Sequence, residues 1–169
     1  FLSTEIKNRA LLNIAEALTA QETAILTANK KDYEEGLASG MSEALLDRLL
    51  LNRSRLQGMA NDIKAVVALP DPVGEMIDMR NLPNGLIIGR KRVPLGVIGT
   101  IYESRPNVTV DISVLCLKSG NAVILRGGKE ALNSNDALAH TVQIAAYKAG
   151  VPEGAVQFIE STDRALVSQ

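Results

Sequence analysis

The chain has 169 residues, of which 46% are hydrophobic and 22% charged, with a formal net charge of −1. Three tyrosines, two phenylalanines and a near balance of acidic and basic residues give little support for nucleic-acid binding. No run approaches the roughly 18 apolar residues of a membrane span, and the first residues do not resemble a secretion signal. We therefore expect a globular, cytoplasmic protein that does not insert into a membrane.

The two metal-binding and redox residue types are nearly absent. One cysteine, Cys116, excludes an internal disulfide, and one histidine, His140, leaves no plausible site for a soft metal. The chain begins with Phe1 rather than methionine, which suggests a piece of a longer protein.

Residues 1–70 show the apolar spacing of amphipathic helices. The first helix has an N-cap candidate at Ser3, and the second starts at Gln21-Glu22 and ends between Gly36 and Gly40. The charged run 30–35 on the second helix is most simply its solvated face. A third helix starts at Ser42, and a fourth starts at Asn52 or Ser54 and stops before Pro70.

The apolar period changes in residues 71–93. Residues 75–80 and 86–93 alternate as strands do, and Asn84-Gly85 between them is a strong signal for a hairpin turn. We expect a protruding β-hairpin whose edges are covered by a partner subunit, and hence a homo-oligomer.

Residues 94–169 alternate between strands and helices. We expect strands at 97–101, 122–125 and 155–159, separated by helices at 108–118 and 129–149, with a last helix capped at 161–163. Strand 97–101 has the composition of a strand buried on both faces. This order predicts an α/β fold with a parallel, Rossmann-like sheet and right-handed crossovers.

Two turns follow strands of this sheet, where open α/β sheets bind ligands. In the first, Arg105 beside Ser104 could grip a carboxylate or phosphate while Asn107 donates to an oxyanion. The equally weighted alternative is a capped helix with a solvated arginine.

The second turn contains Arg126, Gly127, Gly128 and Lys129. It lies between a strand and a predicted helix N-terminus, which favours a nucleotide phosphate over a purely structural turn. Neither a G-x-G-x-x-G fingerprint nor a Gly-Lys-Ser/Thr phosphate loop is present.

Cys116 and His140 are weaker candidates. Cys116 lies mid-helix between two leucines, which indicates a buried and inert thiol rather than a nucleophile. His140 lies on a long helix, where a solvated or capped side chain is expected.

Four segments together resemble the gamma-glutamyl phosphate reductase family of the aldehyde dehydrogenase superfamily. The segments are RVPLGVIG (92–99), YESRPNV (102–108), KSGN (118–121) and LRGGKEA (125–131). The resemblance covers the whole chain, and it implies an aldehyde-dehydrogenase-like fold of which this chain is the N-terminal portion.

The resemblance also implies a reaction. The family reduces L-glutamyl 5-phosphate to L-glutamate 5-semialdehyde with NADPH in proline biosynthesis, a branch of amino-acid biosynthesis, through a cysteine thioester. That cysteine would lie in a catalytic domain beyond this chain, so the 169-residue chain alone is expected to be inactive. A functional link to glutamate 5-kinase is expected as well.

The implied organisation has three parts: N-terminal helices at 1–70, an oligomerisation hairpin at 71–93 and an incomplete NADP-binding domain at 94–169. Within it, Asn107 resembles the superfamily's oxyanion-stabilising asparagine. Arg126 matches a ribose-binding lysine, and Lys129 replaces a glutamate of NAD-preferring members, which favours a 2′-phosphate. Ser104 and Arg105 are expected to bind the substrate.

Two other interpretations stay open. The chain could be an inert nucleotide-binding or assembly module, or part of an aldehyde dehydrogenase that acts on a free aldehyde. The E-S-R-P-N turn, in place of the superfamily's Pro-Trp-Asn, argues against the last of these.

Overall fold

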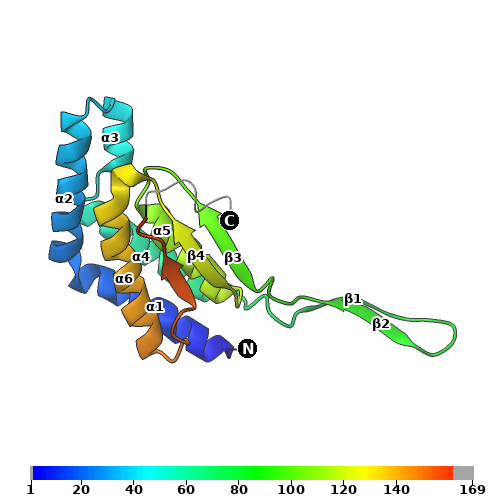
Figure 1. Cartoon of the computed structure of the whole chain (residues 1–169). Coiled ribbons are helices and arrows are strands. Elements are labelled where there is room, and N and C mark those ends of the chain that lie inside the picture. Colours follow the sequence, from blue (N-terminus) through cyan, green and yellow to red (C-terminus); the bar gives the residue numbers. More distant parts are fainter. Residues whose placement is uncertain (1, 162–169) are drawn as a thin grey trace.

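A computed structural model describes residues 2–161, and the elements predicted from the sequence are present in the predicted order (Figure 1). The helices are α1 (Thr4–Ala20), α2 (Glu22–Ala38), α3 (Glu43–Leu49), α4 (Arg53–Ala68), α5 (Asn107–Lys118), α6 (Leu132–Lys148) and a 3-10 turn, η1 (Lys129–Ala131). The strands are β1 (Met76–Asn81), β2 (Ile87–Lys91), β3 (Val97–Ile101), β4 (Ala122–Arg126) and β5 (Val156–Phe158). The helix predicted after residue 161 lies outside the described residues.

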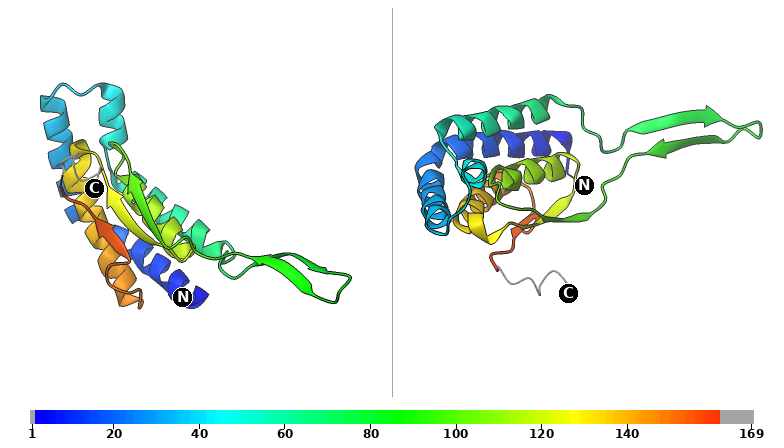
Figure 2. Two further views of the ribbon diagram at one scale, coloured as in Figure 1. Left: turned by 45° about the vertical axis from the view of Figure 1, so that its right-hand side comes forward. Right: turned by 90° about the horizontal axis from the view of Figure 1, so that it is seen from above.

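The three strands β3, β4 and β5 form the parallel sheet that the sequence predicts, with β4 in the middle. Val97 pairs with Ala122, and Val123 pairs with Val156. Helices α5 and α6 pack on this sheet, and α1, α2 and α4 lie behind them, so these five helices are on one face of the sheet (Figure 2, right).

The expected burial of β3 on both faces is wrong for the described residues. Val97 and Ile101 are 66% and 61% exposed, because within residues 2–161 β3 is an edge strand and no helix covers the second face of the sheet. The partly buried Ile98 packs against the core. The apolar composition of β3 therefore exceeds what residues 2–161 bury.

Strands β1 and β2 form an antiparallel hairpin that extends far from the body of the molecule (Figure 1). The turn uses Gly85 with φ +86°, a backbone conformation that glycine adopts without strain. A register shift between Ile77 and Arg80 contains Asp78 at φ 55°. Met79, Leu86 and Ile87 are each more than half exposed, so the hairpin presents apolar surface.

Helix α1 runs through the centre of the core and contacts α4, α5 and α6. Its inward residues Leu11, Ile14 and Leu18 are fully buried, as are Leu138 and Val142 of α6. Burying each such side chain contributes about 1.5–3 kcal/mol. The apolar spacing noted in the sequence thus identifies the buried faces of both helices.

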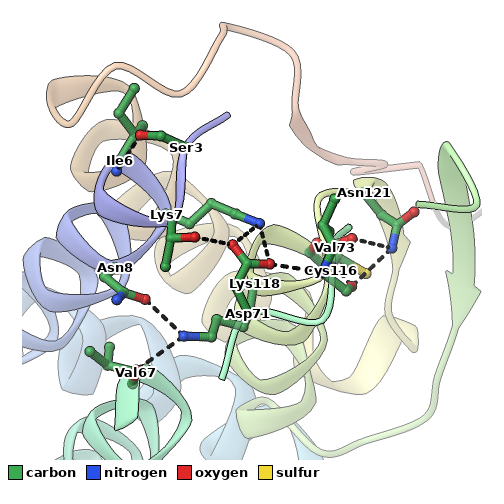
Figure 3. A network of polar contacts seen from close by, with 12 residues as sticks. Ser3, Ile6, Lys7, Asn8, Val67, Asp71, Val73, Cys116, Lys118 and Asn121 are labelled. Carbon is green, nitrogen blue, oxygen red and sulfur yellow. Dashed lines mark hydrogen bonds and ion pairs between the residues drawn. The ribbon is translucent and has the colours of Figure 1, made fainter. Parts of the chain in front are cut away.

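A buried polar network fixes the base of the hairpin (Figure 3). The Nζ of Lys7, which is 1% exposed, lies 2.5 Å from Oδ2 of Asp71, and Thr4 Oγ1 donates to the same carboxylate at 2.6 Å. Asp71 also accepts from the N–H of Val73. Nearby, Lys118 donates to Asn8 Oδ1 and to the Val67 carbonyl, so α1, α4, α5 and the hairpin base are tied together.

The charged run 30–35 is not entirely a solvated face, because Asp32 is 1% exposed. Its carboxylate accepts the N–H groups of Asn133 and Ser134, at 3.1 and 2.7 Å, together with the side-chain donors of both residues. Asp32 of α2 therefore caps the start of α6, a helix about 100 residues away in the sequence. The other charged residues of the run are exposed.

Candidate functional site

The two predicted turns lie side by side at one edge of the sheet. Ile101, the last residue of β3, pairs with Arg126, the last residue of β4. The N–H of Tyr102 donates to the Arg126 carbonyl at 3.1 Å, which holds the turns together. Ligands of open α/β sheets bind at this carboxyl end.

A cavity of about 960 Å³ opens between these turns and the loop that joins α2 to α3. Ser104 of the first turn and all four residues of the second turn line it. Gly40 and Met41 close the opposite side. The structure therefore brings Ser104 together with Arg126, Gly127, Gly128 and Lys129.

Gly127 lies against a chain of hydrogen-bonded polar side chains. Tyr102 Oη and Thr109 Oγ1 are 2.7 Å apart, and Thr109 Oγ1 donates to Asn135 Oδ1 at 3.0 Å. The fully buried Nδ2 of Asn135 has no hydrogen-bond partner within residues 2–161. A Cβ at position 127 would meet that Nδ2 at 2.1 Å, so only glycine fits beside Asn135.

Gly128 is less restricted than Gly127, because the close neighbour of a Cβ there would be the end of the flexible Glu130 side chain. A Cβ there would meet Glu130 Oε2 at 2.7 Å, and Ser104 Oγ donates to the same oxygen at 3.4 Å. Glu130 thus brings a carboxylate into a cavity whose other charged linings include Arg126 and Lys129.

The expected helix N-terminus after this turn is not available to a ligand. The backbone forms the short turn η1 at Lys129–Ala131, and α6 begins only at Leu132. Two N–H groups of the first turn of α6 already donate to Asp32. Any phosphate bound here must rely on the turn itself and on the cationic side chains.

Arg105 and Asn107 line a second hollow instead, of about 320 Å³, on the side of α3 and α4. Asn107 is the first residue of α5, and its Nδ2 donates to Asp111 Oδ2 at 3.1 Å. Burial raises the pKa of Asp111; the Asn107 hydrogen bond opposes this shift, and the charge of Asp62 adds to it. The side chains of the first turn are therefore divided between two adjacent hollows.

Sequence reasoning missed several residues at these hollows. Arg48 of α3 and Asp62 of α4 line the second hollow, and Asn135 lies behind the first. Nothing near Arg48 or Asp62 in the sequence distinguishes them from other polar residues on helix surfaces. The pair Ser134-Asn135 offered a signal, since both are polar residues near the start of the helix predicted at 129–149 and close to the Gly-Gly turn in the sequence.

Cys116 and His140 behave as expected from the sequence. Cys116 is 5% exposed, and burial raises the pKa of its thiol. His140 is exposed on α6. Within residues 2–161, no group of three or more histidine, cysteine or acidic side chains could hold a metal ion, and no helix is long and apolar enough to cross a membrane.

Comparisons with known proteins give a consistent result. No protein-family model matches the chain. It is 62% identical over 168 residues to the gamma-glutamyl phosphate reductase of Dehalococcoides mccartyi strain CBDB1 and 59% identical over 167 residues to that of Tolumonas auensis. These matches cover 99% of the chain and 40% of each relative, so the chain spans about two fifths of their length.

Solved structures agree with the sequence comparison. The gamma-glutamyl phosphate reductase of Thermotoga maritima superposes with a TM-score of 0.94 at 49% identity, covering 98% of this chain and 40% of that one. The gamma-glutamyl phosphate reductase of Saccharomyces cerevisiae has a TM-score of 0.89 at 39% identity, and the match covers 96% of this chain and 42% of that one. A propionaldehyde dehydrogenase of Rhodopseudomonas palustris gives 0.67 at 19% identity, covering 99% and 35%, which shows a shared fold only.

The resemblance inferred from the sequence is thus confirmed. Over 99% of its length the chain is similar to about two fifths of a gamma-glutamyl phosphate reductase, and it shares the fold of the aldehyde dehydrogenases.

Proposed function

We propose that the full-length protein is an oxidoreductase of proline biosynthesis. It would convert L-glutamyl 5-phosphate, NADPH and a proton into L-glutamate 5-semialdehyde, NADP and inorganic phosphate. The observation that carries the proposal is the 62% identity to a gamma-glutamyl phosphate reductase over 99% of the chain. The test is reduction of the acyl phosphate by the purified full-length protein, with phosphate released in equal amount.

The larger cavity has features that suit the nucleotide. Its volume of about 960 Å³ lies in the range of cofactor pockets. The Gly127-Gly128 turn lets a ligand approach the backbone, and Arg126 and Lys129 supply positive charge for phosphate groups. NADPH, when bound, supplies the hydride for the reduction. The protein residues hold and orient it.

Lys129 is proposed to favour NADPH over NADH. An ammonium group near the adenosine ribose attracts a 2′-phosphate, whereas a carboxylate repels it. We expect Lys129→Glu to shift the ratio of kcat/KM for NADPH to that for NADH by roughly tenfold toward NADH. Lys64→Glu, at an exposed position on α4, is the control. Equal ratios in both variants would remove Lys129 from this role.

Arg105 and Asn107 are proposed to act on the substrate, Arg105 by gripping an anionic group and Asn107 by donating to the developing oxyanion. Asn107 would have to release or share its bond to Asp111, since its Nδ2 already donates there. Ser104 lies in the larger cavity and would contact the reacting end of the substrate. Arg105→Ala should raise KM or lower kcat, and unchanged kinetics would exclude its role.

The 169-residue chain alone is proposed to be inactive, because its one cysteine is the buried Cys116. An inert nucleotide-binding or assembly module is the alternative for the isolated chain. A downstream cysteine whose replacement by alanine abolishes turnover supports the enzyme, whereas activity without any such residue contradicts the thioester route.

The surroundings of the enzyme are part of the proposal. We place it in the cytoplasm as a homo-oligomer whose hairpin, with Met79, Leu86 and Ile87 exposed, packs on a partner subunit. A functional link to glutamate 5-kinase is proposed because that kinase class makes the acyl phosphate. A monomeric mass in solution would contradict the role of the hairpin.

A further inference from the structure

Some of the charged side chains that line the second hollow form no hydrogen bond or ion pair within residues 2–161. Arg48 and Arg105 line this hollow of about 320 Å³, and they also line a neighbouring hollow of about 350 Å³ beside Tyr102 and Val108. Neither guanidinium makes a hydrogen bond or ion pair within residues 2–161. Two cations therefore face the same space, and within residues 2–161 neither forms an ion pair with the carboxylates that also line it.

A third arginine at the hollow shows the opposite situation. Arg55 donates to the carbonyl of Leu50 at 2.6 Å and pairs with Asp47 Oδ1 at 2.7 Å, and it also contacts the Asp47 carbonyl. Its donors serve to link α3 to α4. The contrast separates one structural arginine from two that remain available to a ligand.

The hollow is also lined by an acidic residue without a bonding partner among the described residues. Asp62 of α4 lines it and makes no hydrogen bond or ion pair within residues 2–161. Asp62 lies close enough to Asp111 for its charge to act on that carboxyl group, and Asn107 stands between Asp111 and the hollow. Among the described residues, the hollow therefore presents two unpaired cationic groups and one unpaired anionic group.

We propose that this hollow binds the α-amino-acid end of the substrate, with Arg48 and Arg105 on the α-carboxylate and Asp62 on the α-ammonium group. The inference rests on the proposed function and adds to it Arg48 and Asp62, which come from the helical segment. Opposite charges on adjacent atoms of the ligand match opposite charges on the lining. A volume of about 320 Å³ suits a small molecule.

The charges also argue against the acyl phosphate at this position. A phosphate group carries up to two negative charges, and Asp62 and Asp111 would repel it. An α-carboxylate carries one charge, and the ammonium group on the same carbon atom offsets it. The phosphate end of the substrate would then point away from α4, toward the turn after β3.

The experiment uses the full-length protein and follows oxidation of the aldehyde with NADP and phosphate. Three aldehydes are compared: L-glutamate 5-semialdehyde, 5-oxopentanoate, which lacks the amino group, and 4-aminobutanal, which lacks the carboxylate. The variants are Arg48→Gln and Asp62→Asn. Arg53→Gln, at an exposed position on α4 outside the hollow, is the matched control.

Arg48→Gln should lower kcat/KM for the two carboxylate-containing aldehydes by roughly 10- to 100-fold and leave 4-aminobutanal unchanged. Asp62→Asn should lower kcat/KM by a similar factor for the two aldehydes that carry an amino group, and it should leave kcat/KM for 5-oxopentanoate unchanged. Arg48→Lys, which keeps the charge, should recover part of the loss. A structural defect would instead lower activity on all three aldehydes alike.

The outcomes separate failure of the proposed subsite from failure of the proposed enzyme function. If the wild-type protein oxidises the semialdehyde but both variants keep wild-type selectivity, or lose activity equally on all three aldehydes, the subsite is wrong and the enzyme function stands. If the wild-type protein acts on none of the aldehydes and does not reduce the acyl phosphate, the proposed function itself fails.

Discussion

Charged side chains occur in two settings in this molecule, and the contrast between them separates structure from binding. Asp32, Lys7 and Asp71 are buried or nearly so, and each is bonded to groups far away in the sequence. Arg48, Arg105 and Asp62 lie around a hollow at the carboxyl end of the sheet and have no such bonds within residues 2–161. The first group fixes how helices meet, and the second is the group that we propose binds a ligand.

The difference has a physical basis. A buried charge is tolerated only when hydrogen bonds and an opposite charge replace water, so its partners are part of the fold. An exposed arginine keeps its water and needs no partner to be stable. The two groups should therefore respond oppositely to mutation: the first in stability, the second in kinetics.

The largest effect is expected at Asp32. Replacing it by alanine leaves the N–H groups of Asn133 and Ser134 without acceptors in a buried place, which should lower the free energy of unfolding by about 4 kcal/mol. Urea denaturation of the full-length protein measures this change. Glu34→Ala, an exposed position on the same helix, should change stability by less than about 0.5 kcal/mol. Similar losses of unfolding free energy in both variants would show that Asp32 is no more important to stability than an exposed carboxylate.

Lys7→Met should destabilise by about 3 kcal/mol, because it leaves the Asp71 carboxylate without its cation. The double variant Lys7→Met/Asp71→Leu should be less unstable than the single one, since no unpaired charge remains. A double variant that loses the sum of both single effects would show that packing, not charge pairing, dominates here.

The same pair predicts a pH dependence. Burial by itself would raise the pKa of Asp71, but the hydrogen bonds from Lys7, Thr4 and Val73 and the charge of Lys7 outweigh burial and lower it. The stabilisation is therefore complete above the usual carboxyl value of 3.8 and is lost as the pH falls below it. Acid denaturation of Asp71→Asn should show a shallower loss over this range than that of the wild-type protein.

Asn135 combines the two settings, because its Oδ1 accepts a hydrogen bond whereas its Nδ2 has no partner within residues 2–161. Gly127→Ala places a methyl group against Nδ2 and should weaken NADPH binding about tenfold by displacing the turn. In Gly127→Ala/Asn135→Ala the methyl group has room, so part of the affinity should return. Additive losses in the double variant would contradict this steric explanation.

The smallest effect on stability is expected at Arg48. Arg48→Gln should change the free energy of unfolding by no more than about 0.5 kcal/mol, because the guanidinium has no partner within residues 2–161 to lose. Thermal denaturation beside the kinetic measurements checks this directly. A loss comparable to that of Lys7→Met would move Arg48 into the structural group.

The order of elements could be predicted from the sequence because apolar periodicity and turn residues are local signals. The Asn84-Gly85 hairpin, the capping of α1 by Ser3 and the parallel sheet all depend on such signals. Burial could not be predicted in the same way. The exposure of Val97 and the burial of Asp32 depend on which distant segments cover them.

The candidate site was predicted only in part for the same reason. Strand ends identified the two turns, and the parallel register places them side by side. Their division between two hollows depends on where α3 and α4 lie, which the local sequence does not state. Asp32 likewise occupies the helix N-terminus that the Gly-Gly turn led us to expect.

The buried contact between Lys7 and Asp71 has a mechanical consequence. The hairpin leaves the body within a few residues of Asp71. The ion pair between Lys7 and Asp71 therefore attaches the base of the hairpin to α1. Because α1 also packs on α6, the base of the hairpin is connected through α1 to the helix that carries Asn135 behind the Gly127 turn.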